Sequence, residues 1–277
     1  MYGARVRRGG VIAAWVLVVG CGASGPAASP TGSSNVEGNG ASKLPTAPAP
    51  SQSPSFPNPS TPAGQEQFVT TVFDDVQGFW SSSFASAGLP YVPARLVLFM
   101  SSVGTSCGPA TADVGPFYCS GDDTVYLDLR FFAALEQQLG ISGDFSLAYV
   151  VAHEMGHHIQ NVMGITQRVA RTDQQDPTLT NGLSVRVELQ ADCLAGVWAH
   201  STYERNLLEP GDLDEALAAA GAAGDDFLQQ LGPGQVEPEK WTHGSSAQRQ
   251  QWLATGFDSG RPADCNTFTS TTARFAA

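Results

Sequence analysis

The fold of this chain is decided by one stretch, His153-Glu154-Met155-Gly156-His157. Residues four apart on an α-helix lie on the same face, so this spacing places the two imidazole rings one turn apart. Two neutral imidazole nitrogens at that separation can bind a single Zn²⁺ ion. Glu154 is rotated off the ligand face but stays near the open position of such an ion. The stretch therefore predicts a helix that supplies two metal ligands and one carboxylate beside the metal.

This HExxH pattern is typical of zinc-dependent proteases, in which the glutamate takes a proton from the attacking water. A polar helix with solvated histidines is the alternative. Apolar residues flank the pattern on both sides: Phe145, Leu147, Ala148, Tyr149, Val150, Val151, Ala152, Ile159, Val162 and Met163. They favour a buried helix, in which ionisable groups are costly unless paired or bound to a metal. We expect Ser142 or Asp144 to cap the start of this helix and Gly164 to end it.

A second candidate ligand site lies downstream, in Glu188-Leu189-Gln190-Ala191-Asp192. A catalytic zinc ion needs a third protein ligand and keeps its fourth position for water. Glu188 and Asp192 again lie four apart, on one face of a helix expected from about 183 to about 203. One carboxylate would bind the metal, and the other would accept the second ring N–H of a ligand histidine and fix its tautomer.

Two alternatives to this arrangement stay open. Asp192 can be the ligand with Glu188 in support. The two acids can also form a surface pair that faces Arg186 or Arg205, although the neighbouring positions are apolar. The metzincin pattern, which needs Gly and His at set distances after HExxH, is excluded because Gln160 and Met163 hold those places.

Several further blocks of sequence occur in a defined order. They are Cys107-Gly108, Gly115-Pro116-Phe117-Tyr118-Cys119, Val125-Tyr126-Leu127-Asp128, Phe131-Phe132, Ala148 to Gln160, Arg186 to Ala199 and Thr242 to Arg249. Together they resemble the bacterial neutral zinc metallopeptidases, a gluzincin-like family. The resemblance implies a zincin-like fold, zinc and peptidase activity, and it is silent on the substrate. In gluzincins a glutamate ligand is followed one turn later by an aspartate, which implies Glu188 as the ligand and Asp192 as its support.

Residues 1–20 look like a targeting segment. Three arginines precede an apolar run at 11–20 that is too short to span a bilayer. The run ends in Val18-Val19-Gly20-Cys21, which resembles a bacterial lipobox. We therefore expect acylation of Cys21 and a lipid anchor that holds the protein on the cell membrane, facing outside the cytoplasm. An ordinary secretory peptide with a chance cysteine is the alternative.

Residues 21–64 are rich in Pro, Ser, Gly, Ala and Thr and cannot bury a core, so they predict a disordered tether. The metallopeptidase domain is expected at 65–277.

The net charge is −12, and removal of residues 1–20, which hold three arginines and no acid, lowers it to −15. A chain this acidic is expected to bind no nucleic acid and to meet a membrane only through its lipid anchor.

Four cysteines remain besides Cys21: Cys107, Cys119, Cys193 and Cys265. An even set in an exported protein predicts two disulfides, for which three pairings are possible. Cys107–Cys119 closes the shortest loop, and the remaining pair would tie the second ligand helix to the C-terminal region. Cysteine ligation of zinc is disfavoured, because no two cysteines lie two to four residues apart.

The hydrophobic periodicity predicts an α+β domain, mainly helical, with a small sheet. Besides the two ligand helices, we expect helices at 65–87, 131–139, 212–231 and 245–254 and strands at 96–100 and 124–128. The helix at 212–231 should break near Gly221 and Gly224, and Ser245 should cap the last helix. Tyr126 and its neighbours are expected to form an edge strand that aligns an extended peptide above the metal, or else an ordinary half-buried strand.

Three residues outside the ligand helices' motifs are candidates for supporting roles. His243 can donate a hydrogen bond to the oxyanion of a tetrahedral intermediate, with Tyr203 as a second candidate, or it can merely organise the start of the last helix. Arg249 can pair with a buried acid such as Asp192 or Asp128.

These features predict a zinc peptidase that acts on peptide or protein substrates. His153, His157 and Glu188 would hold the metal, Glu154 would act as the general base and acid, and Asp192 would orient a ligand histidine. The alternatives are a zincin-fold lipoprotein that binds partners without cleaving them and a hydrolase of a non-peptide bond. The presence of Glu154 favours hydrolysis.

Overall fold

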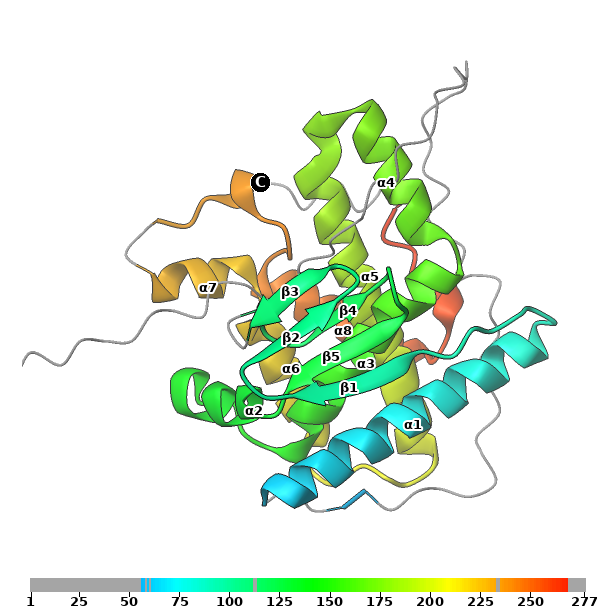
Figure 1. The fold of residues 1–277 in the computed structure, drawn as a ribbon, viewed down its shortest axis with the longest axis vertical. Helices are drawn as coiled ribbons and strands as arrows, with labels where there is room; N and C mark the ends of the chain where they lie inside the picture. The colour runs from blue at the N-terminus through cyan, green and yellow to red at the C-terminus, as the bar shows by residue number, and fades with distance from the viewer. Residues whose placement is uncertain (1–55, 58, 60, 112–113, 233–234, 269–277) are drawn as a thin grey trace, which may run out of the picture.

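The computed structural model describes residues 56–57, 59, 61–111, 114–232 and 235–268. The expectations for the targeting segment, Cys21 and most of the tether fall outside these residues. Within them the chain is mainly helical with a small sheet, which confirms the predicted α+β class (Figure 1). None of the helices in this part of the chain is long and apolar enough to cross a bilayer.

The predicted helices are present, with one further helix at Ile165–Gln175 that was not predicted, and the first helix begins at Pro62, inside the segment expected to be a tether. The helices are α1 (Pro62–Ser86), α2 (Arg130–Ala134), α3 (Asp144–Val162), α4 (Ile165–Gln175), α5 (Thr180–Glu204), α6 (Asp212–Ala222), α7 (Asp225–Leu231) and α8 (Ser246–Ser259). A π-helical segment, η3 (Leu135–Leu139), follows α2, and the 3₁₀ turns are η4 (Pro177–Leu179), η5 (Pro238–Lys240) and η6 (Pro262–Asp264). The break between α6 and α7 falls beside Gly224, and Ser245 caps α8 in a capping box with Gln248, both as predicted.

The larger sheet has three strands in the order β1 (Arg95–Phe99), β5 (Thr124–Asp128) and β4 (Phe117–Cys119). β5 runs parallel to β1 and antiparallel to β4. A separate hairpin joins β2 (Ser102–Thr105) to β3 (Gly108–Thr111). Tyr126 therefore lies in the central strand, paired on both sides, and the expectation that it forms an edge strand is wrong. The edge next to α3 is β4.

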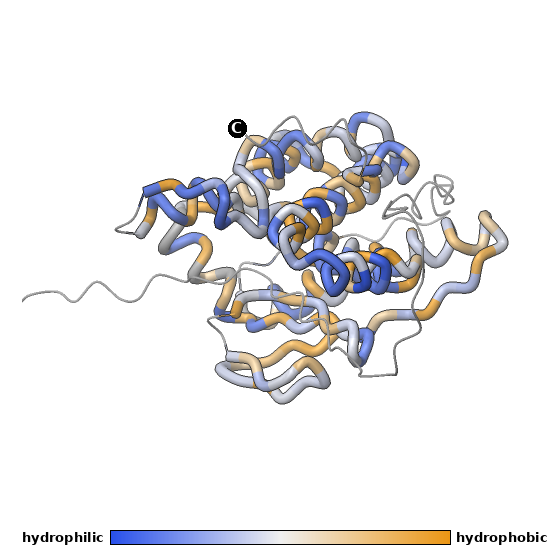
Figure 2. The backbone as a smooth tube through the Cα atoms, turned by 90° about the horizontal axis from the view of Figure 1, so that it is seen from above, coloured by the Kyte–Doolittle hydropathy of each residue, from blue (hydrophilic) through white to orange (hydrophobic). Residues whose placement is uncertain are grey.

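The two ligand helices form the centre of the domain. α3 packs against α1, α5 and α6, and α5 also packs along α8. Every residue of α3 from Phe145 to Gln160 is buried, as the apolar flanks predict. The outer helices alternate hydrophobic and hydrophilic positions along the tube, as expected of helices with one buried face (Figure 2). α3 ends at Val162, and Gly164 follows in the left-handed region at a φ of 68°, as predicted.

The start of α3 differs from the prediction. Neither Ser142 nor Asp144 caps it, because Gly143 holds the N-cap position at a φ of 104°. The carboxylate of Glu215, from α6, instead accepts a hydrogen bond from the Phe145 N–H at 3.2 Å. Glu215 lies so close to Gly143 that a Cβ there would be 1.9 Å from Glu215 Cδ. The helix is thus capped by a residue from another helix, and the N-cap position has no room for a side chain.

Two disulfides confirm the favoured pairing. Cys107–Cys119 closes the loop that contains β3 and ends in β4, and Cys193–Cys265 joins α5 to the segment after α8.

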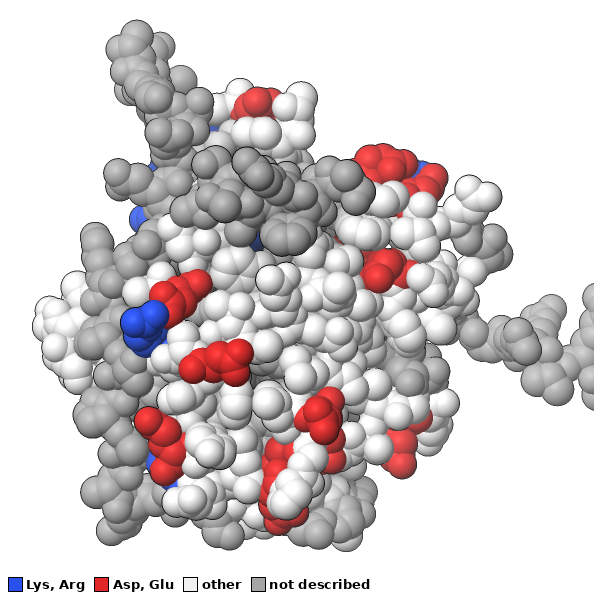
Figure 3. Space-filling view, turned by 180° about the vertical axis from the view of Figure 1, so that it is seen from behind, with Lys and Arg blue, Asp and Glu red and all other residues white. Residues whose placement is uncertain are grey.

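On the surface, Asp and Glu outnumber Lys and Arg on the face shown in Figure 3, in keeping with the net charge of −12.

α5 and α8 approach each other closely at two glycines. A Cβ on Gly196 would lie 2.1 Å from the carbonyl oxygen of Leu253, and a Cβ on Gly256 would lie 1.9 Å from the carbonyl oxygen of Cys193. Both obstacles are backbone atoms of a packed helix, which cannot rotate away as a side chain can. The short distance between these helices therefore requires glycine at both positions.

We expect Gly256→Ala to lower the free energy of unfolding by about 1–3 kcal/mol, because the added methyl group forces α5 and α8 apart. Gly78→Ala is the matched control, since Gly78 lies exposed on α1 and its Cβ would meet nothing within 4 Å. That control should raise the free energy of unfolding by about 0.5–1 kcal/mol through helix propensity alone. Denaturant unfolding measures both values, and equal effects of the two substitutions would contradict the packing described here.

Candidate metal centre

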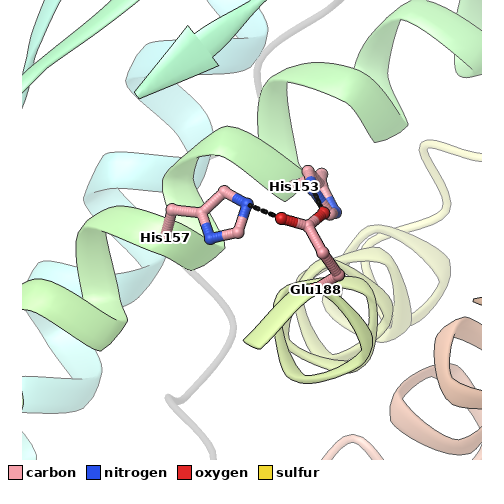
Figure 4. Close-up of side chains that lie close together, drawn as sticks. All are labelled: His153, His157 and Glu188. Carbon is pink, nitrogen blue, oxygen red and sulfur yellow. Dashed lines mark ion pairs between the residues drawn. The ribbon is translucent and has the colours of Figure 1, made fainter. Parts of the chain in front are cut away.

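Three side chains from two helices point toward one another in the core (Figure 4). His153 and His157 lie one turn apart on α3, and Glu188 approaches from α5. Nε2 of His153 is 3.2 Å from Glu188 Oε2, and Nε2 of His157 is 3.5 Å from Glu188 Oε1. One atom from each residue lies within 4.8 Å of the other two. The structure therefore brings together the three residues that the sequence predicts as metal ligands.

This donor set fits a zinc ion. The three residues are buried, with exposed fractions of 3%, 3% and 1% for His153, His157 and Glu188. Nε2 of His157 and Oε2 of Glu188 nevertheless have no hydrogen-bond partner. Unpartnered polar atoms in a core are costly, and a cation between them would satisfy both. Ligand atoms around a tetrahedral zinc ion, each about 2.0–2.1 Å from it, lie about 3.3 Å apart, close to the observed contacts.

Hydrogen bonds on the far side of each ring fix how the histidines face the centre. Nδ1 of His153 is 2.8 Å from Asp192 Oδ1, and Nδ1 of His157 is 2.9 Å from Gln160 Oε1. Both partners are oxygen acceptors, so each Nδ1 carries the proton and donates it. Each neutral ring then presents the lone pair of Nε2 to the centre, which is the form that binds a metal.

Asp192 is the hub of a buried polar network. Its Oδ1 accepts from the Tyr149 hydroxyl at 2.6 Å, and its Oδ2 accepts from Arg249 Nε at 2.8 Å. Burial alone would raise the pKa of this carboxyl, but the charges of Arg249 and His153 outweigh it and hold the pKa well below its usual range. Both oxygens of Asp192 are thus engaged, whereas Glu188 faces the histidines. This geometry favours Glu188 as the ligand and Asp192 as the residue that orients His153.

The arginine contacts decide two further expectations. Arg249 is 2% exposed and binds Asp192, which is one of the two partners predicted for it. The other candidate, Asp128, is bound by Arg130 at 2.7 Å. The alternative of a surface pair facing Arg186 or Arg205 is wrong, because Glu188 and Asp192 are both buried and Arg205 binds Asp75 at 2.6 Å.

The Asp192 and Glu188 carboxylates make a positive charge between them favourable. Burial lowers the pKa of His157 to about 4 and so keeps its ring neutral. Burial opposes ionisation of Glu188, but its interactions with the His157 and His153 imidazoles outweigh burial and bring its pKa to about 2. Burial likewise opposes a charge on His153, yet Asp192 and Glu188 raise its pKa to about 9.

Glu154 lies beside the centre, on the turn of α3 that holds the two histidines. It is 1% exposed, and burial raises its pKa to about 7. The backbone N–H of Tyr118, in the edge strand β4, donates a hydrogen bond to its carboxylate. The second carboxylate oxygen, Oε2, has no partner. The edge strand thus holds one side of Glu154 and leaves one oxygen available.

His243 lies close enough for its charge to act on Glu188. Asp225, at the start of α7, holds the loop before α8: its Oδ1 is 3.0 Å from Nδ1 of His243, and its Oδ2 accepts from the backbone N–H of His243 at 2.7 Å. The next residue, Gly244, packs on α5 beside Leu189, where an added Cβ would lie 3.4 Å from a leucine methyl. Burial lowers the pKa of His243, but the Asp225 hydrogen bond and the Glu188 charge outweigh it and raise the pKa overall.

The structure places Tyr203 and two other histidines of the chain outside the metal centre. Tyr203, the second predicted oxyanion donor, is 62% exposed near the end of α5 and contacts Phe257, so that prediction is wrong. His200 binds the carbonyl of Phe257 at 2.6 Å and takes no part in the site. His158, also on α3, contacts the Tyr118 hydroxyl at 3.1 Å and the Val92 carbonyl at 2.7 Å.

Sequence reasoning did not assign roles to several residues of the site: Tyr149, Gln160, Gln190, Tyr118 and Asp225. Helical spacing identifies the first two, because Tyr149 precedes His153 by four residues and Gln160 follows His157 by three. No local signal identifies Tyr118 or Asp225, since both reach the site from other elements.

A helix with paired histidines and a glutamate, completed by a carboxylate from a second helix, defines the class of zinc metallopeptidases. The family model described as "Putative neutral zinc metallopeptidase" matches residues 4–268. The chain belongs to this family.

Relatives occur in enterobacteria and mycobacteria. YpfJ of Escherichia coli (strain K12) is 48% identical over 204 residues, which are 73% of this chain and 71% of YpfJ. Rv2575 of Mycobacterium tuberculosis (strain H37Rv) is 49% identical over 191 residues, 65% of this chain and 64% of Rv2575. Both relatives are described as uncharacterized proteins. No solved structure matches the chain significantly.

Substitution of Asp192 and of Glu188 separates the roles of the two residues. We expect Asp192→Asn to lower the free energy of unfolding of the metal-free protein by about 3–5 kcal/mol, because it leaves the charge of Arg249 buried without its partner. Glu188→Gln should change that free energy far less, since Glu188 lies 3.8 Å from Arg249, but should abolish stoichiometric zinc binding. Denaturant unfolding and elemental analysis measure the two effects. A Glu188→Gln protein that still holds one zinc per chain would contradict the ligand assignment.

Proposed function

We propose that this protein is a zinc-dependent peptidase that hydrolyses peptide bonds. The observation that carries the proposal is the convergence of two imidazole Nε2 atoms and the Glu188 carboxylate beside a glutamate with a free oxygen. The family to which the chain belongs supports zinc and a peptidase. Three protein ligands leave one position open, which is typical of catalytic rather than structural zinc sites.

Zinc at this centre would lower the pKa of the attacking water toward roughly 7 and polarise the scissile carbonyl. The chain's own residues supply the rest of the chemistry. Oε2 of Glu154, which has no other partner, accepts the proton of the attacking water and delivers it to the leaving amine. His153 and His157 hold their Nε2 lone pairs toward the centre because Asp192 and Gln160 accept their Nδ1 protons.

His243 is the proposed donor to the oxyanion of the tetrahedral intermediate. Asp225 holds its Nδ1, so the ring presents Nε2 as the second N–H when it is protonated. The raised pKa of His243 favours that protonated form. A preorganised donor of this kind stabilises charge that develops only as the water attacks.

We expect Glu154→Gln to keep one zinc per chain and to lower kcat/KM on a mixed peptide substrate by about 10²–10⁴-fold, because the proton acceptor is lost. His243→Ala should also retain zinc and should lower kcat by about 10²–10³-fold. Glu66→Gln, an exposed position on α1, is the matched control and should leave both quantities unchanged.

The same assays discriminate the alternatives. A wild-type protein that binds zinc but cleaves no peptide would favour a binding protein or a hydrolase of another bond. Hydrolysis by Glu154→Gln at the wild-type rate would overturn the role of Glu154. Activity that survives complete removal of zinc by a chelator would overturn the metal mechanism.

We also propose that the protein is exported and anchored to the cell membrane through a lipid on Cys21. The lipobox-like sequence before Cys21 supports acylation, and the two disulfides suit an oxidising compartment outside the cytoplasm.

Cys21→Ser tests the anchor. In a bacterium that processes lipoproteins, the wild-type protein should incorporate labelled fatty acid and sediment with the membranes, and the Cys21→Ser protein should do neither. A variant that remains in the membrane fraction, or a wild type that takes up no label, would overturn the anchor without touching the peptidase assignment.

A further inference from the structure

We propose that Gln160, Gln190 and the Cys193–Cys265 disulfide act together as a positioning relay that holds His157 in its metal-binding orientation. The inference rests on the proposed zinc site and adds the means by which the C-terminal segment controls it. It gives a role to two buried glutamines and to one of the two disulfides.

The relay is a continuous chain of hydrogen bonds. Nδ1 of His157 donates to Oε1 of Gln160 at 2.9 Å. Nε2 of Gln160 donates to the carbonyl of Val187 at 2.7 Å and to Oε1 of Gln190 at 3.2 Å. Nε2 of Gln190 donates to the carbonyl of Cys265 at 2.9 Å. The chain therefore runs from a metal ligand on α3, across α5, to the segment that follows α8.

The two backbone carbonyls give this chain a single direction. A carbonyl oxygen only accepts, so the Cys265 carbonyl requires the NH₂ group of Gln190 and leaves Oε1 of Gln190 facing Gln160. The Val187 carbonyl imposes the same orientation on Gln160. Oε1 of Gln160 must then face His157, whose Nδ1 has to carry the proton. The fixed carbonyls thus select the tautomer in which Nε2 of His157 is free for a metal.

The disulfide holds the far end of the relay. Cys265 follows η6 and is bonded to Cys193, which lies three residues after Gln190 on α5. Both cysteines are fully buried, at 0% exposure. Thr267 adds a second tie through its hydroxyl, which donates to the Arg186 carbonyl at 2.6 Å. A hydrogen bond is weaker than the covalent link, so we expect loss of the disulfide to loosen the hold on the Cys265 carbonyl over Gln190.

The other disulfide provides a natural comparison. Cys107–Cys119 joins β4 to the turn between β2 and β3. No hydrogen bond in the described residues connects it to His153, His157 or Glu188. Loss of either disulfide removes one covalent loop, but only loss of Cys193–Cys265 releases an acceptor that orients a metal ligand.

A purely structural role for the glutamines predicts different behaviour. Two buried amides that merely satisfy each other would affect the free energy of unfolding when replaced, and zinc affinity would stay unchanged. A positioning relay predicts a change in zinc affinity and in the protonation of the His157 ring. The test therefore measures both quantities on folded protein.

The experiment compares wild type, Gln190→Leu, the double variant Cys193→Ala/Cys265→Ala, their combination, and the control Cys107→Ala/Cys119→Ala. Zinc dissociation constants are measured by competition with a chromophoric chelator. We expect Gln190→Leu and the Cys193/Cys265 variant each to raise the dissociation constant about 10–100-fold and the control to leave it within about twofold. The combined variant should have the same zinc dissociation constant as whichever of the two separate variants binds zinc more weakly, because both changes break the same chain of hydrogen bonds.

Nitrogen NMR of the metal-free proteins gives a second readout. His157 should be protonated on Nδ1 in wild type and should populate the Nε2-protonated form in Gln190→Leu. Gln190→Leu keeps both disulfides, so it decides the question even where the cysteine variant folds poorly. Unchanged zinc affinity and an unchanged tautomer in Gln190→Leu would overturn the relay. A wild-type protein that binds no zinc would overturn the proposed function as well.

Discussion

The close contact between α3 and α5 is the constraint on which the site depends. At Gly156, between the two ligand histidines, an added Cβ would lie 2.9 Å from the carbonyl oxygen of Ala191. The glycine lets the helix backbones approach until Glu188, one turn before Asp192, reaches both imidazoles. A wider spacing would leave Glu188 too far from His157 to share an ion with it. Gly156, the second variable position of the HExxH pattern, thus has a structural role, which is to set the distance between Glu188 and the two histidines.

Buried charge is the second constraint, because the ligands sit in a core that excludes water. Asp192 and Glu188 are both at most 1% exposed, and Arg249, at 2%, supplies the positive charge that makes the pair tolerable. Burying charges is favourable only when each is paired and hydrogen-bonded. Arg249 meets this condition by binding Asp192 on both oxygens and the carbonyl of Ala223. It comes from α8, so the packing of α8 on α5 is part of the electrostatics of the site.

The sequence predicted what depends on local spacing and missed what depends on long-range packing. The histidine pair, the Glu188–Asp192 pair and the helices that carry them follow from periodicity, and the structure confirms their placement. The edge position of Tyr126 was wrong, because the pairing order of strands is set by residues far apart in the chain. The cap of α3 was missed for the same reason, since Glu215 lies 70 residues from the N–H group that it binds.

The two ligand histidines are supported by different groups, and the difference bears on the chemistry of the ion. His153 donates to a carboxylate, whereas His157 donates to a neutral amide. A carboxylate behind a ring makes it a more basic ligand, while an amide fixes its orientation with less transfer of charge. Because Arg249 offsets the charge of Asp192, Glu188 contributes the main uncompensated negative charge at the centre. Few negative charges around zinc preserve its ability to acidify water, so the amide behind His157 and the arginine behind Asp192 both favour a hydrolytic over a structural site.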